Sequence, residues 1–281
     1  MSGPNRHIVA GVQESYIGFV NSQGFFIGAS TSEPGAGLGS GMIHLLGIQS
    51  ATPGIVEGEV VNVPGDDTTI GQFAFDADQL PAFIVNTGAF NLNTDALLQG
   101  TLVETLNDLK IGVLMPGAPV YPDVCLLLQS FAKSKDTGSD GVKAWQQFIF
   151  PVASIQPLDR EEFAGRTPGV NRLKVTVQRA SRKPWGVTIL DATNGTTNAV
   201  ALKSTSDNPI YFEAFKGNAS ATTRTLDKTP ISVDKIIVHT GTGQKLVPTT
   251  DYTVVTATRV LTFLAAPSAV GLYSIVYEYA P

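Results

Sequence analysis

The chain has 281 residues, of which 15% are charged, 28 are glycine and 17 are proline. An average soluble domain carries roughly 25% charged residues, so this composition indicates a surface that is partly covered by other subunits. The net charge of −5, with no Lys/Arg cluster longer than a dipeptide, argues against a protein that grips nucleic-acid phosphates.

The first predicted elements are two strands, residues 15–21 and 25–29, with a turn between them. They are followed by a glycine-rich stretch, T-S-E-P-G-A-G-L-G-S-G-M-I-H-L-L-G-I-Q-S-A-T-P-G. This stretch lacks the βαβ setting and the lysine of a phosphate-binding loop, so we do not expect a nucleotide site. We expect a long loop with an exposed apolar tip that forms a subunit or ring interface. The interface residues predicted here are Leu38, Met42, Ile43, Leu45 and Leu46.

Residues 56–78 carry six carboxylates and predict a β-hairpin whose turn is P-G-D-D, with Asp66 and Asp67 at its tip. Paired aspartates on such a turn can hold magnesium for nucleotidyl transfer, but a polymerase palm needs several helices and basic channels. Glu57 and Glu59 share one face of the first strand, where two carboxylates can bind calcium or act as acid and base. A solvated acidic face is the interpretation that we favour.

A strand over residues 83–86 is followed by the one strong helical signal of the chain. Asn93-Thr94-Asp95 is typical of a helix cap, and Leu98, Leu102 and Leu106 recur at i, i+4 and i+8. The pattern predicts an amphipathic helix from Asp95 to Leu106. Further strands are expected over residues 110–115, 123–132, 145–155, 171–179 and 185–190, the second and third joined by the polar loop K-S-K-D-T-G-S-D-G.

A polar stretch of small residues at 191–198, D-A-T-N-G-T-T-N, predicts a linker between a first domain, 1–190, and a second, 199–281. Strands are expected in the second domain over residues 208–215, 233–240, 251–255, 260–263 and 272–279. Their regular spacing, with turn signals between them, predicts a small β-sandwich. The expected fold class is therefore mainly β, with one α-helix.

The residues that could carry catalysis are scattered. His7, His44 and His239 have no His or Cys partner at metal-ligand spacing, and no G-x-S-x-G, H-E-x-x-H or Walker sequence occurs. Cys125 lies in V-C-L-L-L-Q, which predicts a buried core residue. The first ten residues lack the apolar core of a signal peptide, and no apolar run reaches the ~18 residues of a membrane span. We therefore expect no catalytic residue, no metal, no cofactor and no membrane partner.

Residues 1 to about 190 resemble phage major tail tube proteins in the order of their features. The segments that carry the resemblance are V-E-G-E-V-V-N-V-P-G-D-D, I-G-Q-F-A-F-D, A-W-Q-Q-F-I-F-P-V-A-S-I-Q-P-L and R-L-K-V-T-V-Q-R-A. Tube proteins of contractile tails, bacteriocins and type VI secretion share that fold. The resemblance implies a tail-tube-like β-sandwich or barrel, ring hexamers whose inner sheets join, and stacked rings that form a conduit for DNA during ejection.

Residues from about 197 on are similar to small β-sandwich modules of virion proteins, through K-I-I-V-H-T-G-T-G-Q-K-L-V-P-T-T-D-Y-T-V-V, V-L-T-F-L-A-A-P and G-L-Y-S-I-V-Y-E-Y. In some tail tube proteins such an immunoglobulin-like domain projects from the outer surface of the tube. Together the two resemblances imply a structural virion protein of the phage tail, assembled in the cytoplasm of a bacterial host.

The partners implied by the resemblance are further copies of the chain and other tail proteins, namely the tape measure, baseplate or tip, and terminator proteins. DNA would pass through without specific binding, which the acidic balance of the chain favours. Glu57, Glu59, Asp66 and Asp67 are the candidates for residues that face the lumen.

Two other classes remain open. A tail fibre, baseplate or capsid decoration protein that binds a host surface would carry a fibrous repeat or a coiled-coil trimeriser, and neither occurs in the sequence. A carboxylate-based hydrolase would need an acid pair with a perturbed pKa in a cleft.

Overall fold

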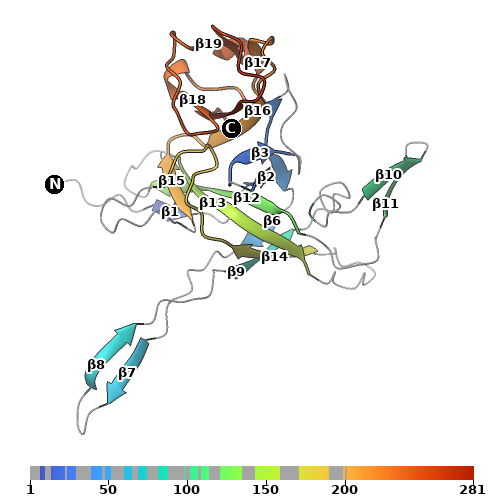
Figure 1. The fold of residues 1–281 in the computed structure, drawn as a ribbon. Helices are drawn as coiled ribbons and strands as arrows, with labels where there is room; N and C mark the ends of the chain where they lie inside the picture. Colours follow the sequence, from blue (N-terminus) through green and yellow to red (C-terminus); the bar gives the residue numbers. More distant parts are fainter. Residues whose placement is uncertain are drawn as a thin grey trace, which may run out of the picture.

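Figure 1 shows a computed structural model of the protein, in which β-strands dominate. Twenty-one strands and two single-turn 3-10 elements, η1 (Val233–Lys235) and η2 (Thr256–Thr258), occur in the described residues. The structure describes residues 7–9, 14–22, 24–29, 39–45, 48–51, 60–64, 69–74, 82–87, 98, 102–106, 109–113, 121–134, 143–158, 171–189, 199 and 201–281.

One large antiparallel sheet forms the body of the protein. Its strands follow the order β3 (Phe26–Gly28), β2 (Glu14–Val20), β12 (Asp123–Ser134), β13 (Lys143–Pro157), β14 (Asn171–Val177), β9 (Ala82–Thr87) and β6 (Ile48–Ala51). Three more strands join it beside this path: β1 (His7–Val9) on β12, β5 (Ile43–Leu45) on β2, and β15 (Leu202–Ser206) on β13. The two longest strands, β12 and β13, pair from Lys133↔Lys143 to Asp123↔Ser154, which confirms the predicted long hairpin.

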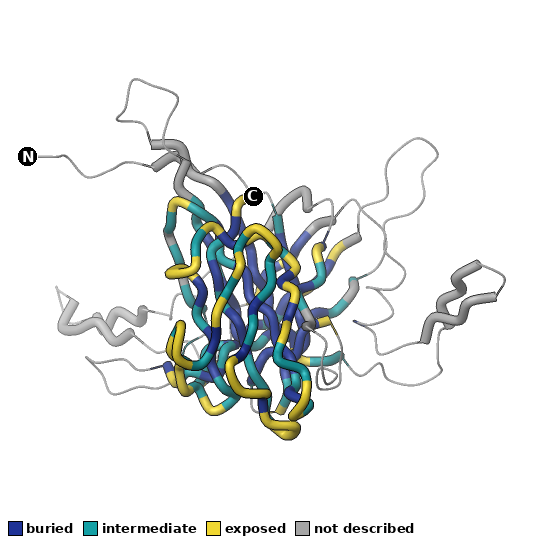
Figure 2. The backbone as a smooth tube through the Cα atoms, turned by 90° about the horizontal axis from the view of Figure 1, so that it is seen from above, coloured by how far each residue is buried: buried dark blue, intermediate teal, exposed yellow. Residues whose placement is uncertain are grey.

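The large sheet has the burial pattern that its sequence predicts. In β14, Leu173, Val175 and Val177 are buried, and the residues between them are not. In β12 every residue from Val124 to Leu128 is buried, so this strand is covered on both faces. Seen from above in Figure 2, buried segments run through the centre of the body and exposed segments lie around them.

Two smaller sheets at the C-terminal end, which we call the C-terminal sheets, face each other. One has the order β18 (Ile236–Thr240), β21 (Leu272–Glu278), β16 (Ile210–Lys216) and β4 (Gly39–Ser40), and the other has the order β17 (Thr223–Thr225), β20 (Val260–Phe263) and β19 (Tyr252–Val255). The rings of Phe215 in β16 and Phe263 in β20 lie 5.4 Å apart, so the two sheets share a core. The five strands predicted for the second domain are confirmed, except that residues 233–235 form η1, and the strands β4, β15 and β17 were missed.

The chain enters the C-terminal sheets after the position at which the sequence predicts a linker. Residues 191–198 lie outside the described residues, and the strand that follows them, β15, pairs with β13 of the large sheet. The next strand, β16, pairs with β21. The chain therefore changes sheet between Ser206 and Ile210.

The helix predicted over Asp95–Leu106 is wrong for residues 102–106, while residues 95–97 and 99–101 lie outside the described residues. Leu98 is helical and buried, but residues 102–106 form β10 (Leu102–Leu106), which pairs with β11 (Leu109–Val113). No helix of seven residues or more is present in the described part of the chain. Leu106 pairs with Leu109, so residues 107–108, Asn-Asp, connect the strands, and this pair is typical of a hairpin turn. β-branched residues between the leucines also favour a strand.

The acidic hairpin is confirmed as a hairpin. β7 (Val60–Pro64) and β8 (Thr69–Ala74) pair antiparallel, while the turn that holds Asp66 and Asp67 lies outside the described residues. Like β10–β11, this hairpin is a sheet of two strands, with no third strand among those that the structure describes. Figure 1 shows both hairpins projecting from the body.

Candidate functional site

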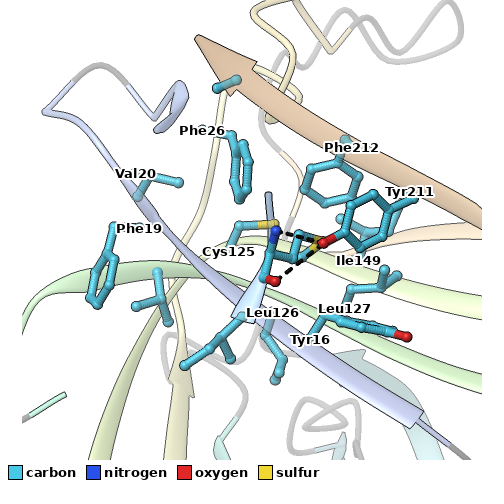
Figure 3. Packing of buried hydrophobic residues seen from close by; sticks show 14 of the residues in the cluster. Tyr16, Phe19, Val20, Phe26, Cys125, Leu126, Leu127, Ile149, Tyr211 and Phe212 are labelled. Atoms are coloured by element: carbon cyan, nitrogen blue, oxygen red, sulfur yellow. Dashed lines mark hydrogen bonds between the residues drawn. The ribbon is translucent and has the colours of Figure 1, made fainter. Parts of the chain in front are cut away.

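The C-terminal sheets pack on the large sheet along a contact that we call the seam, which holds both aromatic rings and a cluster of polar groups. The aromatic part is shown in Figure 3: Phe212 of β16 meets Phe26 of β3 edge-on, with 5.0 Å between ring centroids. Trp185, which follows β14, lies 6.2 Å from Phe212. All three come from segments far apart in sequence, so the two parts of the fold share one core.

Two glycines allow the segment after β14 to approach the turn after β18. Gly186 and Gly243 both have positive φ angles, +82° and +87°. A Cβ atom added to Gly186 would lie 2.8 Å from the carbonyl oxygen of Gly241, and one added to Gly243 would lie 2.7 Å from that of Gly186. Backbone therefore meets backbone here, which only glycine permits.

The glycine-rich stretch crosses the seam. Ser40 in β4 pairs with Ala214 in β16, and the Tyr211 hydroxyl accepts a hydrogen bond from Met42 N at 2.9 Å and donates one to Met42 O at 3.2 Å (dashed in Figure 3). Residues 39–45 of this stretch are thus an integral part of the fold rather than a free loop.

That arrangement corrects the prediction of an exposed apolar tip. Met42 and Leu45 are 8% and 7% exposed, and Ile43 packs against the core. The prediction failed because residues 43–45 pair with β2 and residues 39–40 pair with β16 of the same chain, so this segment is built into the sheets. Leu38 and Leu46 lie outside the described residues, so their place in a ring interface stays a prediction.

Two buried glutamines connect the large sheet to β16. The Gln147 side chain mimics a strand, because its Oε1 accepts from Ile210 N and its Nε2 donates to Ile210 O, both at 3.0 Å. Gln147 Nε2 also donates to Gln129 Oε1 at 2.9 Å, and Gln129 Nε2 donates to the Tyr279 hydroxyl at 3.3 Å. Both glutamines are fully buried, so each bond also satisfies a group that water cannot reach.

An aromatic cage at the seam encloses Lys228. Its Nζ lies 5.7 Å from the ring centroid of Tyr16, 5.8 Å from that of Tyr211 and 5.5 Å from that of Tyr279. The Tyr16 hydroxyl donates to Glu14 Oε2 at 2.5 Å. Tyr16 belongs to the large sheet and the other rings to the C-terminal part, so the ammonium group attracts ring faces from both sides of the seam.

Replacing Lys228 by Met should lower the free energy of unfolding by about 1 kcal/mol, because the apolar stem is kept and the cation–π attraction is lost. Urea denaturation measures the change. Lys235→Met is the matched control, since the Lys235 ammonium makes only a surface ion pair with Glu278 at 3.3 Å and should cost less than about 0.5 kcal/mol. Equal losses in both variants would contradict a stabilising cage.

Glu213 fixes the loop that carries Lys228. Its Oε1 accepts hydrogen bonds from the Tyr277 hydroxyl at 2.5 Å and from Asp227 N at 2.9 Å, and the same hydroxyl accepts from Lys228 N at 3.0 Å. Glu213 is 1% exposed. Burial, and then the charge of Asp227, raise the pKa of Glu213 to about 7, while the two hydrogen bonds and Arg224 oppose the rise.

The groups at the seam hold structure together and are poor nucleophiles. Burial raises the pKa of the hydroxyls of Tyr16, Tyr211, Tyr277 and Tyr279, so each stays protonated and donates or accepts hydrogen bonds. Burial likewise raises the pKa of the Cys125 thiol, which is fully buried as predicted. These hydroxyls and this thiol therefore contribute packing and hydrogen bonds at the seam.

No three His, Cys, Asp or Glu side chains in the described residues are grouped so that they could hold a metal ion. In the same part of the chain no helix is long and apolar enough to cross a membrane.

Four further residues were predicted to lie at a functional site, and the residues of the seam were not. Glu57, Glu59, Asp66 and Asp67 lie outside the described residues, so their place at a lumen stays a prediction. The seam was missed by sequence reasoning. One signal was present, a carboxylate in the middle of an apolar strand, I-Y-F-E-A-F-K, because a charge in such a strand must have buried partners.

Comparison with known proteins does not assign the chain to a family: no protein-family model matches it, and no curated protein matches it.

Proposed function

We propose that this protein is a structural virion protein that assembles with copies of itself into stacked rings, the tube of a phage tail through which DNA passes. One observation carries the proposal: β7–β8 and β10–β11 are two-stranded sheets without a third strand among the described ones. An isolated hairpin is marginally stable in water, and its free edges pair readily with other chains. Hairpins of this kind are well suited to close a sheet across subunits.

The closure of a barrel across subunits supports a tube rather than another assembly. A barrel removes the free edges of its strands, and a head-to-tail contact between rings repeats without end, which gives a filament. The large antiparallel sheet supplies the wall, and the hairpins supply strands that join neighbouring copies. The resemblance of residues 1 to about 190 to tail tube proteins implies hexameric rings.

The C-terminal sheets are proposed to be an immunoglobulin-like module on this wall. Two of their strand orders, β17-β20-β19 and β18-β21, match the B-E-D and C-F strand orders of that fold. β16 takes the place beside β21 that a G strand would occupy. Because the seam fixes this module to the large sheet, it would move with the wall rather than swing on a linker.

Negative-stain electron microscopy of the purified protein at low and high concentration tests the proposal. We expect rings at low concentration and hollow tubes at high concentration. Persistent monomers or compact trimers would overturn it and favour the alternative of a fibre or decoration protein that binds a host surface.

A further inference from the structure

A polar hollow of about 230 Å³ opens on the large sheet, away from the seam network described above. Its walls come from four places: the turn between β2 and β3, the start of β12, Val152 of β13, and the residues that follow β14. The polar side chains that line it are Asn21, Ser22, Asp123, Gln178, Arg179, Ser181 and Arg182.

Two guanidinium groups line the hollow without side-chain partners in the described part of the chain. Among the described residues neither Arg179 nor Arg182 has an ion pair or a side-chain hydrogen bond. The carboxylate in the wall, Asp123, is already engaged, because its Oδ1 accepts from Gln178 Nε2 at 2.8 Å. A guanidinium is a planar fork that matches a carboxylate, so two free forks in one hollow favour a ligand with carboxylates.

The charges of the chain are segregated along the sequence. Residues 1–109 hold one basic and eleven acidic residues, a net charge of −10, and the remaining 172 residues hold eighteen basic and thirteen acidic, a net charge of +5. Within these parts, residues 56–78 carry six acidic and no basic residues, and residues 163–190 carry six basic and no acidic residues. Arg179 and Arg182 belong to the basic stretch.

We propose that the hollow binds the acidic hairpin of a second copy of this chain, with Asp66 and Asp67 of that copy paired to Arg179 and Arg182, a contact between copies in place of the lumen position predicted for these two aspartates from the sequence. The inference rests on the proposed self-assembly and names the contact that drives it. The hairpin β7–β8 pairs only with itself among the described strands, and its two strands project from the body in Figure 1. Opposite charges on the two surfaces steer their encounter and fix their register.

Disulfide trapping tests the contact directly. Asp67→Cys is combined with Arg182→Cys in one chain, and the protein is oxidised and run on a non-reducing gel. We expect a ladder of covalently linked copies, because cysteines at a true contact lie within disulfide reach. Cys125 is fully buried and adds little background. The control pairs Asp67→Cys with Lys174→Cys, in the same basic stretch but outside the hollow, and should stay monomeric.

Charge reversal tests the same contact without cysteines. Arg179→Glu with Arg182→Glu should raise the protein concentration needed for assembly by at least about tenfold, since like charges then face each other. Adding Asp66→Lys and Asp67→Lys to that variant should restore assembly. Arg172→Glu with Lys174→Glu makes the same charge change outside the hollow and should shift the concentration less than about twofold.

The outcomes separate this inference from the proposed function. Tubes that form normally with the reversed arginines, together with a gel that shows monomers only, overturn the arginine contact and leave the tube intact. A disulfide closed within one chain also overturns it. A ladder of linked copies without rings or tubes supports the contact and overturns the tube, and monomers in every assay overturn both.

Discussion

Phe212→Ala should lower the free energy of unfolding by about 3 to 5 kcal/mol, the usual cost of removing a fully buried aromatic ring. Phe212 is 1% exposed and contacts Phe26 and Trp185 across the seam. The cavity therefore opens between the large sheet and the C-terminal sheets, and it should weaken both together. Urea denaturation followed by tryptophan fluorescence reports on Trp145 and Trp185, which are outside the C-terminal sheets.

Hydrogen exchange of the amides in β16 and β21 supplies the matching probe for the C-terminal sheets. Both probes should show one transition with the same, lowered midpoint. Val270→Ala is the control, because Val270 is 86% exposed and its truncation should change stability by less than about 0.5 kcal/mol. Two separate transitions, with fluorescence unchanged by Phe212→Ala, would show that the C-terminal sheets fold as an independent unit.

Glu213→Gln should remove a pH dependence from the stability of the protein. The pKa of Glu213 is about 7 in the folded chain and its ordinary value is 4.5, so the folded state binds the proton more tightly. The resulting stabilisation is fully present below about pH 4.5 and is lost as the pH rises through 7. Between pH 5 and pH 8 the wild type should lose about 2 to 3 kcal/mol that the Gln variant does not lose.

The comparison is made as a difference between the two proteins at each pH, so that other titrating groups cancel. His239 is one of these, because burial lowers its pKa and its contribution is lost as the pH falls. Glu278→Gln is the control: it removes a carboxylate of β21 that pairs with Lys235 and leaves the Glu213-dependent loss in place. Parallel pH profiles for wild type and Glu213→Gln would contradict the role given to burial.

The strands of this fold were largely readable from local patterns. β14 alternates apolar and polar residues, and turn residues separate the C-terminal strands. Both local patterns therefore agree with the structure. Residues 102–106 were predicted as helix because the spacing of Leu98, Leu102 and Leu106 fits a helical period as well as it fits the two-residue period of a strand. The Asn-Asp pair at 107–108 favours the hairpin that forms. The spacing of the leucines alone could not decide between helix and strand.

The seam was beyond local patterns for a different reason. Lys228 is caged by Tyr16, and Gln147 binds the backbone of Ile210, pairs that no spacing in the sequence brings together. Met42 was mispredicted for the same reason. An apolar residue in a glycine-rich stretch is predicted to be exposed unless the distant strand that pairs with the stretch is known. Contacts between distant segments depend on how the sheets are stacked.

The pairing of Ser40 with Ala214 joins positions that are 174 residues apart, and it sets an order of events during synthesis. β4 must wait for β16 to be made before it gains a partner, and contacts of such long range form slowly. A nascent chain that stops early leaves β4 without its partner and the rings of Tyr16 and Phe26 uncovered. The core that β4 shares with the C-terminal sheets is therefore completed only after β16 has been synthesised.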